Sequence, residues 1–368
     1  MLKVLLVSAF PPNRQTAGQD YTRRLVLDLL GYGHEISLIY AAYPGHAVEL
    51  PLEVEILHVI RTSIRNCIGR LPYHPFYAKR IDDETLHLLR SVADNFDVLY
   101  FDFSQVHLYS LYVNHPCKIL MCHDVIRQKF KRSGILHLPF IAFAERQTLL
   151  SARTVVTFSK KDSNLLKQYY DTDACNVNFY LKSESLSFDN MSIASGTFCF
   201  YGAWNRKENY LPLKWFLKKV YPRLNKELSF VIIGGGLRTD IKQLISAMDN
   251  VICLGFVEYP ILEIARCQAL IAPLRNGAGV KVKVIDALSC GTPVIGTDVA
   301  FEGITIDPEN DLFFSADTVG EYVRIIDNWK NRTVACKQRA SAKFRSKYDS
   351  NHFPELLEKI VQQGVSTC

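Results

Sequence analysis

Apolar stretches rich in β-branched residues alternate with helix-like segments along the whole chain. This alternation is typical of βαβ units, which build parallel sheets. In the first half it predicts strands at Lys3–Ala9, Glu35–Tyr40, Val54–Val59, Val98–Phe101, Ile119–Cys122 and Thr154–Phe158. In the second half it predicts strands at Thr197–Tyr201, Ser229–Ile233, Val251–Leu254, Ala269–Ala272 and Pro293–Gly296. Each half is therefore expected to form a doubly wound, Rossmann-like α/β domain.

A polar segment separates the two halves. Residues 181–196 are rich in Ser, Asn and Asp, which is the composition of a linker. We expect a first Rossmann-like domain at residues 1–185, a second at 186–348, and a C-terminal helix at 349–368 that packs back toward the first domain. Ligands in such sheets bind beyond the carboxyl ends of the strands, so two facing domains predict one deep cleft between them.

Composition narrows the class of protein. The net charge of +6 is spread over both halves, which gives little support to nucleic-acid binding. The ten cysteines form no CxxC pair, so buried thiols in a reducing cytoplasm are a better interpretation than disulfides or zinc. No segment is long and apolar enough to span a bilayer. The short apolar run at the N-terminus leads into a Pro-Pro turn, as a first strand would and a signal peptide would not.

Two basic stretches stand out against this even background. Residues 61–80 contain five basic and no acidic residues, interleaved with Ile, Leu, Tyr and Phe, and a second basic run, RQKFKR, occupies 127–132. The pattern fits either a solvated surface or a basic, aromatic surface that rests on anionic lipid headgroups. On the second hypothesis the protein is a peripheral one on the cytoplasmic, inner face of a membrane.

The segment RNGAGVK, residues 275–281, follows a predicted strand and precedes a helix expected from about Val280 to Ser289. Gly277 and Gly279 allow positive φ and a close approach of the backbone to a ligand. The free amides and positive dipole end of a helix start favour an anion. The loop is therefore predicted to hold an anion.

Charged residues at the same place identify the anion further. Lys281 and Lys283 lie at the helix start, where cations are unfavourable by about 0.3–1 kcal/mol each unless an anion compensates. A diphosphate would supply that charge. Asp286, almost one turn beyond Lys283, is suited to the paired hydroxyls of a ribose. The alternative is a local Lys–Asp pair on a solvated helix, which leaves the two glycines unexplained.

The run GAGVKVKVIDALSCGTPVIGTDVAFEGI, residues 277–304, resembles the donor-binding motif of retaining GT-B glycosyltransferases of family 4. In that family a glycine-rich loop, a helix with an acidic residue and a GxPVV strand hold a nucleoside diphosphate sugar. Weaker resemblances follow in chain order: LLVSAFPP, AGQDYTRRLVLDLLGYGHEISLI, CHDVIRQ, ARTVVTFSKKDSNLL, YGAWNRKEN and FVIIGGG. Together they cover nearly the whole chain.

One departure concerns the pair of glutamates that many family members carry in this motif. Asp286 stands at the second position, and Ala278 stands at the first. The loop resembles a variant subgroup with GxGxxxK in place of the first glutamate. Recognition of the sugar would then pass to Asn276, loop amides or Arg275. Whether Ala278 alters or abolishes activity stays open.

The resemblance also implies roles for residues outside the loop. Arg206 and Lys207 are expected near the phosphates, where fixed cations stabilise a departing diphosphate. His123 follows a strand and is expected to contact the transferred sugar or the acceptor, with Asp124 orienting it or binding acceptor hydroxyls. The predicted catalytic residues are His123, Asp124, Arg206 and Lys283. The predicted donor-binding residues are Gly18, Arg206, Lys207, Asn276, Gly277, Ala278, Gly279, Val280, Lys281, Lys283 and Asp286.

The sequence therefore predicts a cytoplasmic glycosyltransferase that moves a hexose-like sugar from a nucleoside diphosphate to a glycan, with retention. The acceptor is expected to be a lipid-linked intermediate of polysaccharide biosynthesis, and no metal or cofactor is expected. The DTD at 171–173 follows an amphipathic helix and fits a solvated turn better than a metal motif. The glycines of FVIIGGG lack the dehydrogenase spacing. A GT-B-like sugar-nucleotide epimerase and a non-catalytic sugar-nucleotide-binding protein remain alternatives.

Overall fold

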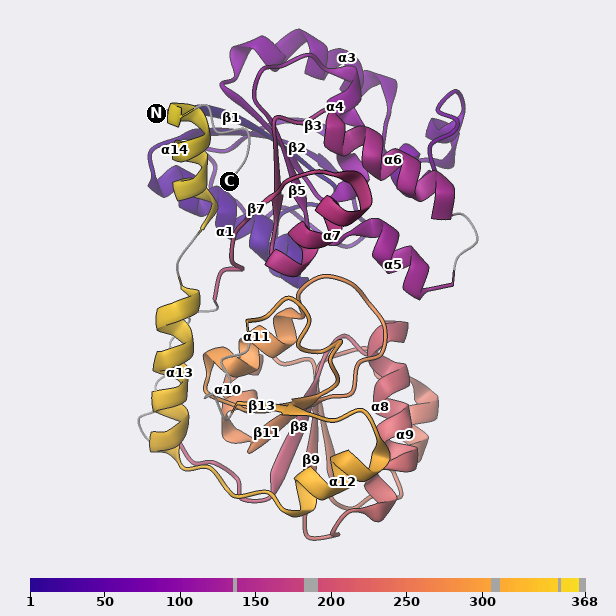
Figure 1. The fold of residues 1–368 in the computed structure, drawn as a ribbon, viewed down its shortest axis with the longest axis vertical. Coiled ribbons are helices and arrows are strands. Elements are labelled where there is room, and N and C mark those ends of the chain that lie inside the picture. The colour runs from indigo at the N-terminus through magenta and orange to yellow at the C-terminus, as the bar shows by residue number, and fades with distance from the viewer. Residues whose placement is uncertain (135–137, 182–190, 306–311, 350–351, 364–368) are drawn as a thin grey trace. The chain divides into compact units, whose positions relative to one another are not determined.

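The chain forms two compact units in the computed structural model (Figure 1). The structure describes residues 1–134, 138–181, 191–305, 312–349 and 352–363. The first unit contains residues 1–180 and the C-terminal helix α14 (Phe353–Gln363), and the second contains residues 181–350. The predicted boundary between residues 185 and 186 lies outside the described residues.

The first unit is built on a seven-stranded parallel sheet with the order β3-β2-β1-β4-β5-β6-β7. Its strands are β1 (Lys3–Ser8), β2 (Glu35–Ala41), β3 (Glu55–Ile60), β4 (Val98–Asp102), β5 (Lys118–Cys122), β6 (Thr154–Thr157) and β7 (Cys175–Asn176). The central strands are almost entirely apolar and buried, as expected for a parallel sheet covered on both faces. The strand order reverses between β1 and β4, and such a switch point is where ligands bind.

Helices cover both faces of this sheet (Figure 1). They are α1 (Ala17–Gly31), α2 (Pro75–Ala78), α3 (Asp83–Val92), α4 (Tyr109–Tyr112), α5 (Ile126–Arg132), α6 (Leu138–Leu150) and α7 (Lys160–Tyr170), with 3-10 turns η1 (Ile64–Cys67), η2 (Ala93–Asn95) and η3 (Ser104–Val106). Helix α14 packs beside α1, and the buried ring of Phe353 lies 4.7 Å from that of Tyr100. The last helix of the chain therefore completes the core of the first unit.

The second unit has a six-stranded parallel sheet with the order β10-β9-β8-β11-β12-β13. Its strands are β8 (Thr197–Tyr201), β9 (Ser229–Ile233), β10 (Val251–Gly255), β11 (Ala269–Ala272), β12 (Val294–Gly296) and β13 (Phe313–Ser315). Its helices are α8 (Lys207–Lys219), α9 (Thr239–Ile245), α10 (Pro260–Arg266), α11 (Val282–Ser289), α12 (Val319–Asp327) and α13 (Val334–Tyr348), with the 3-10 turn η4 (Tyr221–Arg223). The switch point falls between β8 and β11.

The predicted fold class, two doubly wound α/β units, is confirmed. Each predicted strand is present, and its ends fall within one residue of the expected ones. The sequence pattern missed β7 and β13, which have two and three residues and lie at sheet edges. Such short strands bury too few apolar residues to produce a periodic signal. In the part of the chain that the structure describes, no helix combines the length and hydropathy needed to cross a bilayer.

The cysteines largely agree with the expectation of thiols. Eight cysteines within the described ranges are free, and most are buried. Cys175 is an exception, because its sulfur belongs to a disulfide. The prediction of thiols is therefore wrong for Cys175. Spacing along the chain carries no signal for a bridge whose sulfurs meet only after folding.

Candidate functional site

The glycine-rich loop of the second unit connects β11 to α11. Gly277 and Gly279 have φ angles of 108° and 65°, so the predicted positive φ values are confirmed. Helix α11 begins at Val282, two residues later than expected. Its N-cap residue is Lys281, and no side chain caps the first turn. The first amides of α11 are thus left for water or a ligand.

Lys281 holds the loop in this conformation. Its ammonium donates hydrogen bonds to the carbonyl oxygens of Ala278 and Gly279, at 3.1 and 2.6 Å. The same ammonium lies 3.8 Å from a carboxylate oxygen of Glu302, and both side chains are largely buried. Lys281 therefore stabilises the loop conformation, and Glu302 partly balances its charge. Sequence analysis did not single out Glu302, because its partner is distant along the chain.

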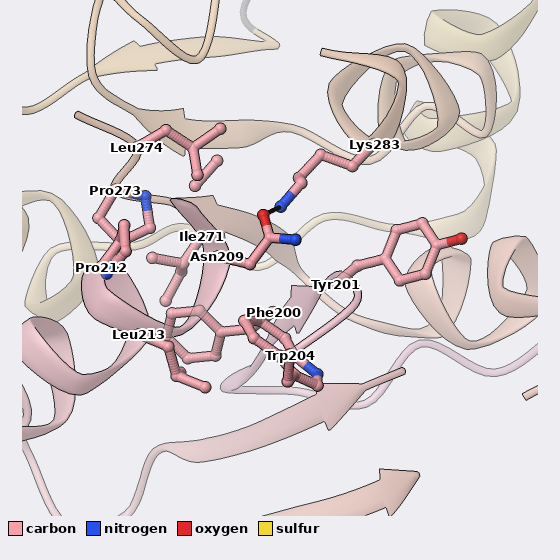
Figure 2. A pocket seen from close by; sticks show the side chains of 11 residues that line it. Phe200, Tyr201, Trp204, Asn209, Pro212, Leu213, Ile271, Pro273, Leu274 and Lys283 are labelled. Atoms are coloured by element: carbon pink, nitrogen blue, oxygen red, sulfur yellow. Dashed lines mark hydrogen bonds between the residues drawn. The ribbon is translucent and has the colours of Figure 1, made fainter. Parts of the chain in front are cut away.

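Lys283 is the second residue of α11, and its side chain reaches α8. Its ammonium donates a 2.7 Å hydrogen bond to the side-chain oxygen of Asn209 (Figure 2). The amide nitrogen of Asn209 donates in turn to the carbonyl of Ala203, at 2.9 Å, which fixes the oxygen toward Lys283. A Cβ atom at Gly202 would lie 3.1 Å from the ammonium nitrogen, so the turn after β8 also closes on it. The sequence pattern gave no signal for Asn209.

The ammonium of Lys283 is enclosed, although the residue as a whole is half-buried. Burial lowers the pKa of Lys283 to about 7, Glu208 raises it, and the positive charges of Arg206 and Lys281 lower it. An anion bound beside the ammonium would favour its charged form and raise this pKa. The protonation of Lys283 is therefore expected to depend on whether an anion lies beside it.

The start of α8 provides a second uncapped helix end. Its N-cap residue is Arg206, and no side chain caps this turn either. The Arg206 guanidinium nitrogen Nε lies 3.4 Å from Glu208 Oε1, and Lys207 follows on the surface. Trp204 lies just before, where its indole donates to the carbonyl of Ile233 at 3.0 Å. This hydrogen bond fastens the turn after β8 to the end of β9 beside the site.

A small pocket lies beneath the Lys283–Asn209 pair (Figure 2). Most of its walls are apolar, and they come from β8, α8 and the end of β11. The lining side chains drawn in Figure 2 are Phe200, Tyr201, Trp204, Asn209, Pro212, Leu213, Ile271, Pro273, Leu274 and Lys283. An enclosed polar pair over an apolar floor is a common arrangement of a ligand site.

The remaining predicted residues of the second unit occupy different environments. Asp286 is buried within α11, with 3% of its surface exposed. Asn276 is exposed, whereas Ala278 and Val280 are half-buried. Arg275 donates to the carbonyl of Asp317 at 2.9 Å and lies over the Trp215 ring, 5.0 Å from its centroid. These bonds hold Arg275, so Asn276 is the better candidate of the two for a sugar hydroxyl.

The switch point of the first unit carries a second polar group, in which His123 is bound to a carboxylate. His123 Nε2 lies 2.7 Å from Asp102 Oδ1, and the Thr22 hydroxyl donates to the other oxygen of Asp102. Asp102, at the end of β4, is completely buried. The pair leaves His123 Nδ1 as the nitrogen directed elsewhere. Sequence analysis missed Asp102, because the strand containing it is otherwise apolar.

Aromatic rings surround His123. Phe103 stacks on the imidazole at 3.8 Å with an interplanar angle of 14°, and the Tyr21 and Phe158 rings meet it edge-on. Gly18, the second residue of α1, is also close, since a Cβ there would lie 2.8 Å from the Phe103 ring and 3.6 Å from His123 Nδ1. Gly18 is therefore needed to admit this packing.

The expectation that Asp124 orients His123 is wrong. Its carboxylate accepts a 2.8 Å hydrogen bond from Lys129, whereas the imidazole is held by Asp102. The reason is topological: the end of β4 lies beside the end of β5, and the side chain of Asp102 reaches the imidazole from the neighbouring strand. Asp124 remains a candidate for binding acceptor hydroxyls.

The first amides of α5, the helix that follows His123, are hydrogen-bonded to the buried carboxylate of Glu145. Glu145 accepts hydrogen bonds from the amides of Ile126 and Arg127, at 2.6 and 2.9 Å, and from the Tyr170 hydroxyl at 2.6 Å. Burial raises the pKa of Glu145, while these bonds lower it. The start of α5 is therefore filled by the protein itself, unlike the starts of α8 and α11.

The DTD at 171–173 behaves as a turn. Asp171 ends α7 in a left-handed conformation, with φ of 55°. The ammonium of Lys167 lies 2.9 Å from Asp171 and 3.1 Å from Asp173. The two carboxylates thus share one lysine on an exposed turn.

Residues 195–329, most of the second unit, match the family model described as glycosyl transferases group 1. A curated protein of Klebsiella pneumoniae, an uncharacterized 44.6 kDa protein in the cps region, is 29% identical over 157 residues. The match covers 39% of this chain and 40% of that protein, so it spans about two-fifths of the relative.

Solved glycosyltransferases share the whole fold. HepE of Anabaena, solved with UDP, aligns over 98% of this chain and 99% of its own, with 12% identity and a TM-score of 0.64. TarM of S. aureus, solved with UDP and alpha-GlcNAc-glycerol, aligns over 98% of this chain and 99% of its own, with 10% identity and a TM-score of 0.71. WaaG, a glycosyltransferase involved in lipopolysaccharide biosynthesis, aligns over 98% of this chain and 99% of its own, with 13% identity and a TM-score of 0.65. At these identities the likeness establishes the fold, the GT-B type predicted from the sequence.

The depressed pKa of Lys283 makes the stability of the ligand-free protein depend on pH. The unfolded lysine has a pKa near its ordinary value of about 10.4, so between pH 7 and 10 the unfolded state binds more protons and stability rises with pH. We expect Lys283→Met to be more stable than the parent at pH 6 and to lose this advantage toward pH 10. Urea denaturation at both pH values measures the difference. Lys218→Met, at an exposed position of α8, should show no such trend.

Proposed function

We propose that this chain transfers a sugar from a nucleoside diphosphate sugar to a glycan acceptor. One observation carries the proposal: the ammonium of Lys283 is enclosed against Asn209 beside two helix starts that no side chain caps. Open amides and an enclosed cation together favour a diphosphate. Residues 195–329 match a glycosyltransferase family model, so we infer that the diphosphate belongs to a nucleoside diphosphate sugar.

Similar structures indicate which nucleotide to test first. HepE was solved with UDP, with UDP and glucose, and with UDP-glucose, and TarM with UDP. These ligands belong to those proteins. They make UDP and UDP-sugars the leading candidates for this chain, with Asn276 and the loop amides at Gly277 and Gly279 proposed to recognise the sugar in place of the glutamate that Ala278 replaces.

Catalysis on this proposal depends on stabilising the departing diphosphate. Lys283 and the amides at the start of α11 face the developing charge, and Arg206 or Lys207 adds to it from the start of α8. A charge-assisted hydrogen bond of this kind contributes about 1.5–3 kcal/mol. Asp286 is proposed to accept from the ribose hydroxyls. The cations come from the protein, so we propose a reaction that needs no metal or other cofactor.

His123 is proposed to act on the transferred sugar or on the acceptor. Asp102 accepts from Nε2, so Nδ1 is the nitrogen free to exchange a hydrogen bond with a substrate hydroxyl. Gly18 keeps the start of α1 close to that nitrogen. Asp102 is thus a positioning residue that fixes the tautomer of His123, and Asp124 is proposed to bind acceptor hydroxyls.

The acceptor is proposed to be a lipid-linked glycan, used by a peripheral protein on the cytoplasmic face of an anionic membrane. Arg61 and Arg65, from the first basic stretch, are exposed, as is Lys131 from the second. Charges of this kind attract anionic headgroups. WaaG, whose name concerns lipopolysaccharide biosynthesis, has the same fold.

Donor binding tests the carrying observation directly. UDP, GDP, dTDP, ADP and their sugars are added with EDTA present, and the melting temperature is measured. A ligand at about 100 times its Kd stabilises by about 2.7 kcal/mol, so one nucleotide series should raise the melting temperature by several degrees. Lys283→Ala should abolish this shift without unfolding the protein, because it removes the enclosed cation.

Lys218→Ala is the matched control for this experiment. It removes an exposed ammonium from the last turn of α8, far along the helix from the proposed phosphates, and should keep the full shift. An undiminished shift in Lys283→Ala would mean that the diphosphate binds elsewhere. A shift without turnover would favour a non-catalytic binding protein, and donor turnover without acceptor would favour an epimerase.

The stereochemistry of the product is a further prediction. The described residues offer no pair of carboxylates arranged as nucleophile and acid within either site, so a front-face route assisted by the departing phosphate is proposed. The anomeric configuration of the donor should then be retained. Proton NMR of the product measures the anomeric coupling constant, and an inverted anomer would contradict this mechanism.

The role of Asp102 can be separated from a purely structural one. Asp102→Asn should lower kcat about a hundredfold while leaving the donor KM nearly unchanged, because the imidazole loses its tautomer control. The pH profile of kcat should change shape, which lost stability alone would not cause. Asp124→Asn should preserve the pH profile of the parent, since Asp124 pairs with Lys129 and not with the imidazole. Equal changes in both variants would refute the assignment.

A further inference from the structure

Three apolar side chains of the first unit project almost fully into solvent. They are Ile64 on η1 and Ile68 and Leu71 in the following loop, with exposures of 80%, 78% and 86%. The rings of Tyr73, His74 and Phe76, next along the chain, pack instead toward Phe130 and Phe143. The segment that follows therefore attaches Ile64, Ile68 and Leu71, here called the apolar tip, to the core. The exposure of the tip is a feature of the folded unit.

Helix α6 presents a second apolar face next to this tip. Phe140, Phe143 and Leu150 are 49%, 41% and 61% exposed and lie on one side of the helix, opposite the buried Ile141 and Leu149. The Tyr73 ring stacks on Phe143 with centroids 5.8 Å apart. This contact joins the segment after η1 to α6, so the tip and the helix face belong to one region of the first unit.

The charges in this region are positive. Arg61, Arg65, Lys131 and Arg146 are exposed. Residues 61–80 contain no carboxylate, and Glu145 is the single acidic residue of 126–150. Glu145 is buried against the start of α5, so it does not offset the surface charge. Arg70 differs from the others, because Asp83 of α3 balances it at 2.6 Å.

We propose that this region is a membrane-docking surface, in which Ile64, Ile68, Leu71, Phe140 and Phe143 enter the outer hydrocarbon of an anionic bilayer. The proposal rests on the membrane contact proposed above and names the residues that make it. Exposed apolar side chains gain from transfer into hydrocarbon, and the neighbouring guanidinium and ammonium groups gain from lipid phosphates. An uncharged surface would not select anionic lipid, and a purely basic one would not insert.

Vesicle flotation with matched triple variants tests the surface. The parent should float with vesicles of equal phosphatidylcholine and phosphatidylglycerol at 50 mM salt, and much less with phosphatidylcholine alone. Ile64→Ser/Ile68→Ser/Leu71→Ser should lower the bound-to-free ratio at least tenfold. The control Leu52→Ser/Ile56→Ser/Ile252→Ser removes the same residue types from other exposed positions and should leave the ratio within twofold.

Insertion itself can be measured by fluorescence. Leu71→Trp should show a blue shift and quenching by brominated lipid on addition of anionic vesicles, whereas Leu52→Trp should show neither. The native tryptophans, Trp204, Trp215 and Trp329, provide the baseline to subtract. Binding in which the tip and control triples lose equally, or in which the tip triple loses nothing, would overturn the proposal, as would a parent that ignores anionic vesicles.

These outcomes are independent of sugar transfer. The nucleotide-induced melting shift is measured without vesicles and involves the second unit, so the tip triple should retain it. Loss of flotation with an intact shift would support the docking surface, whereas flotation without any nucleotide shift would leave the surface standing and refute the proposed donor site.

Discussion

The hydrogen bond between the Lys283 ammonium and the Asn209 amide is the interaction on which the candidate donor site depends. It joins α11 to α8 and holds a cation where burial lowers its pKa to about 7. The negative charge of Glu208 raises this pKa, whereas the positive charges of Arg206 and Lys281 lower it. A cation that is enclosed but lacks a bonded carboxylate is stabilised when an anion binds. This arrangement favours a negatively charged ligand and supports the proposed donor site.

The helix starts reinforce this interpretation. Helices α7 and α12 are capped by Ser159 and Thr318, and the start of α5 is filled by the carboxylate of Glu145. The starts of α8 and α11 instead carry Arg206 and Lys281 as N-cap residues without a side-chain cap. The starts of α9 and α10 also lack a side-chain cap, but the starts of α8 and α11 lie beside the enclosed ammonium of Lys283, and their first amides are left for water or a ligand.

Much of the candidate donor site could be predicted from the sequence. Of the polar group at the switch point of the first unit, the sequence predicted His123 but not Asp102. The glycines at 277 and 279, the cations and the helix after them are consecutive, so local spacing was sufficient to associate them with an anion. Asn209, Glu302 and Asp102 were missed, because each reaches its partner from a part of the chain that is distant in sequence. Of the two roles expected for Asp124, the orientation of His123 belongs to Asp102 instead, because adjacent residues at a strand end point in different directions.

What the sequence determined by itself is the alternation of strands and helices, the family resemblance of the second unit, and the conformation that the loop glycines permit. These follow from local periodicity and from residues close together in the chain. The tertiary structure decided which side chains meet. Asn209 and Lys283 are 74 positions apart, and Asp102 and His123 are 21 apart. Parallel strands bring such residues to one sheet edge, so their pairing depends on strand order and packing, which no short window of sequence contains.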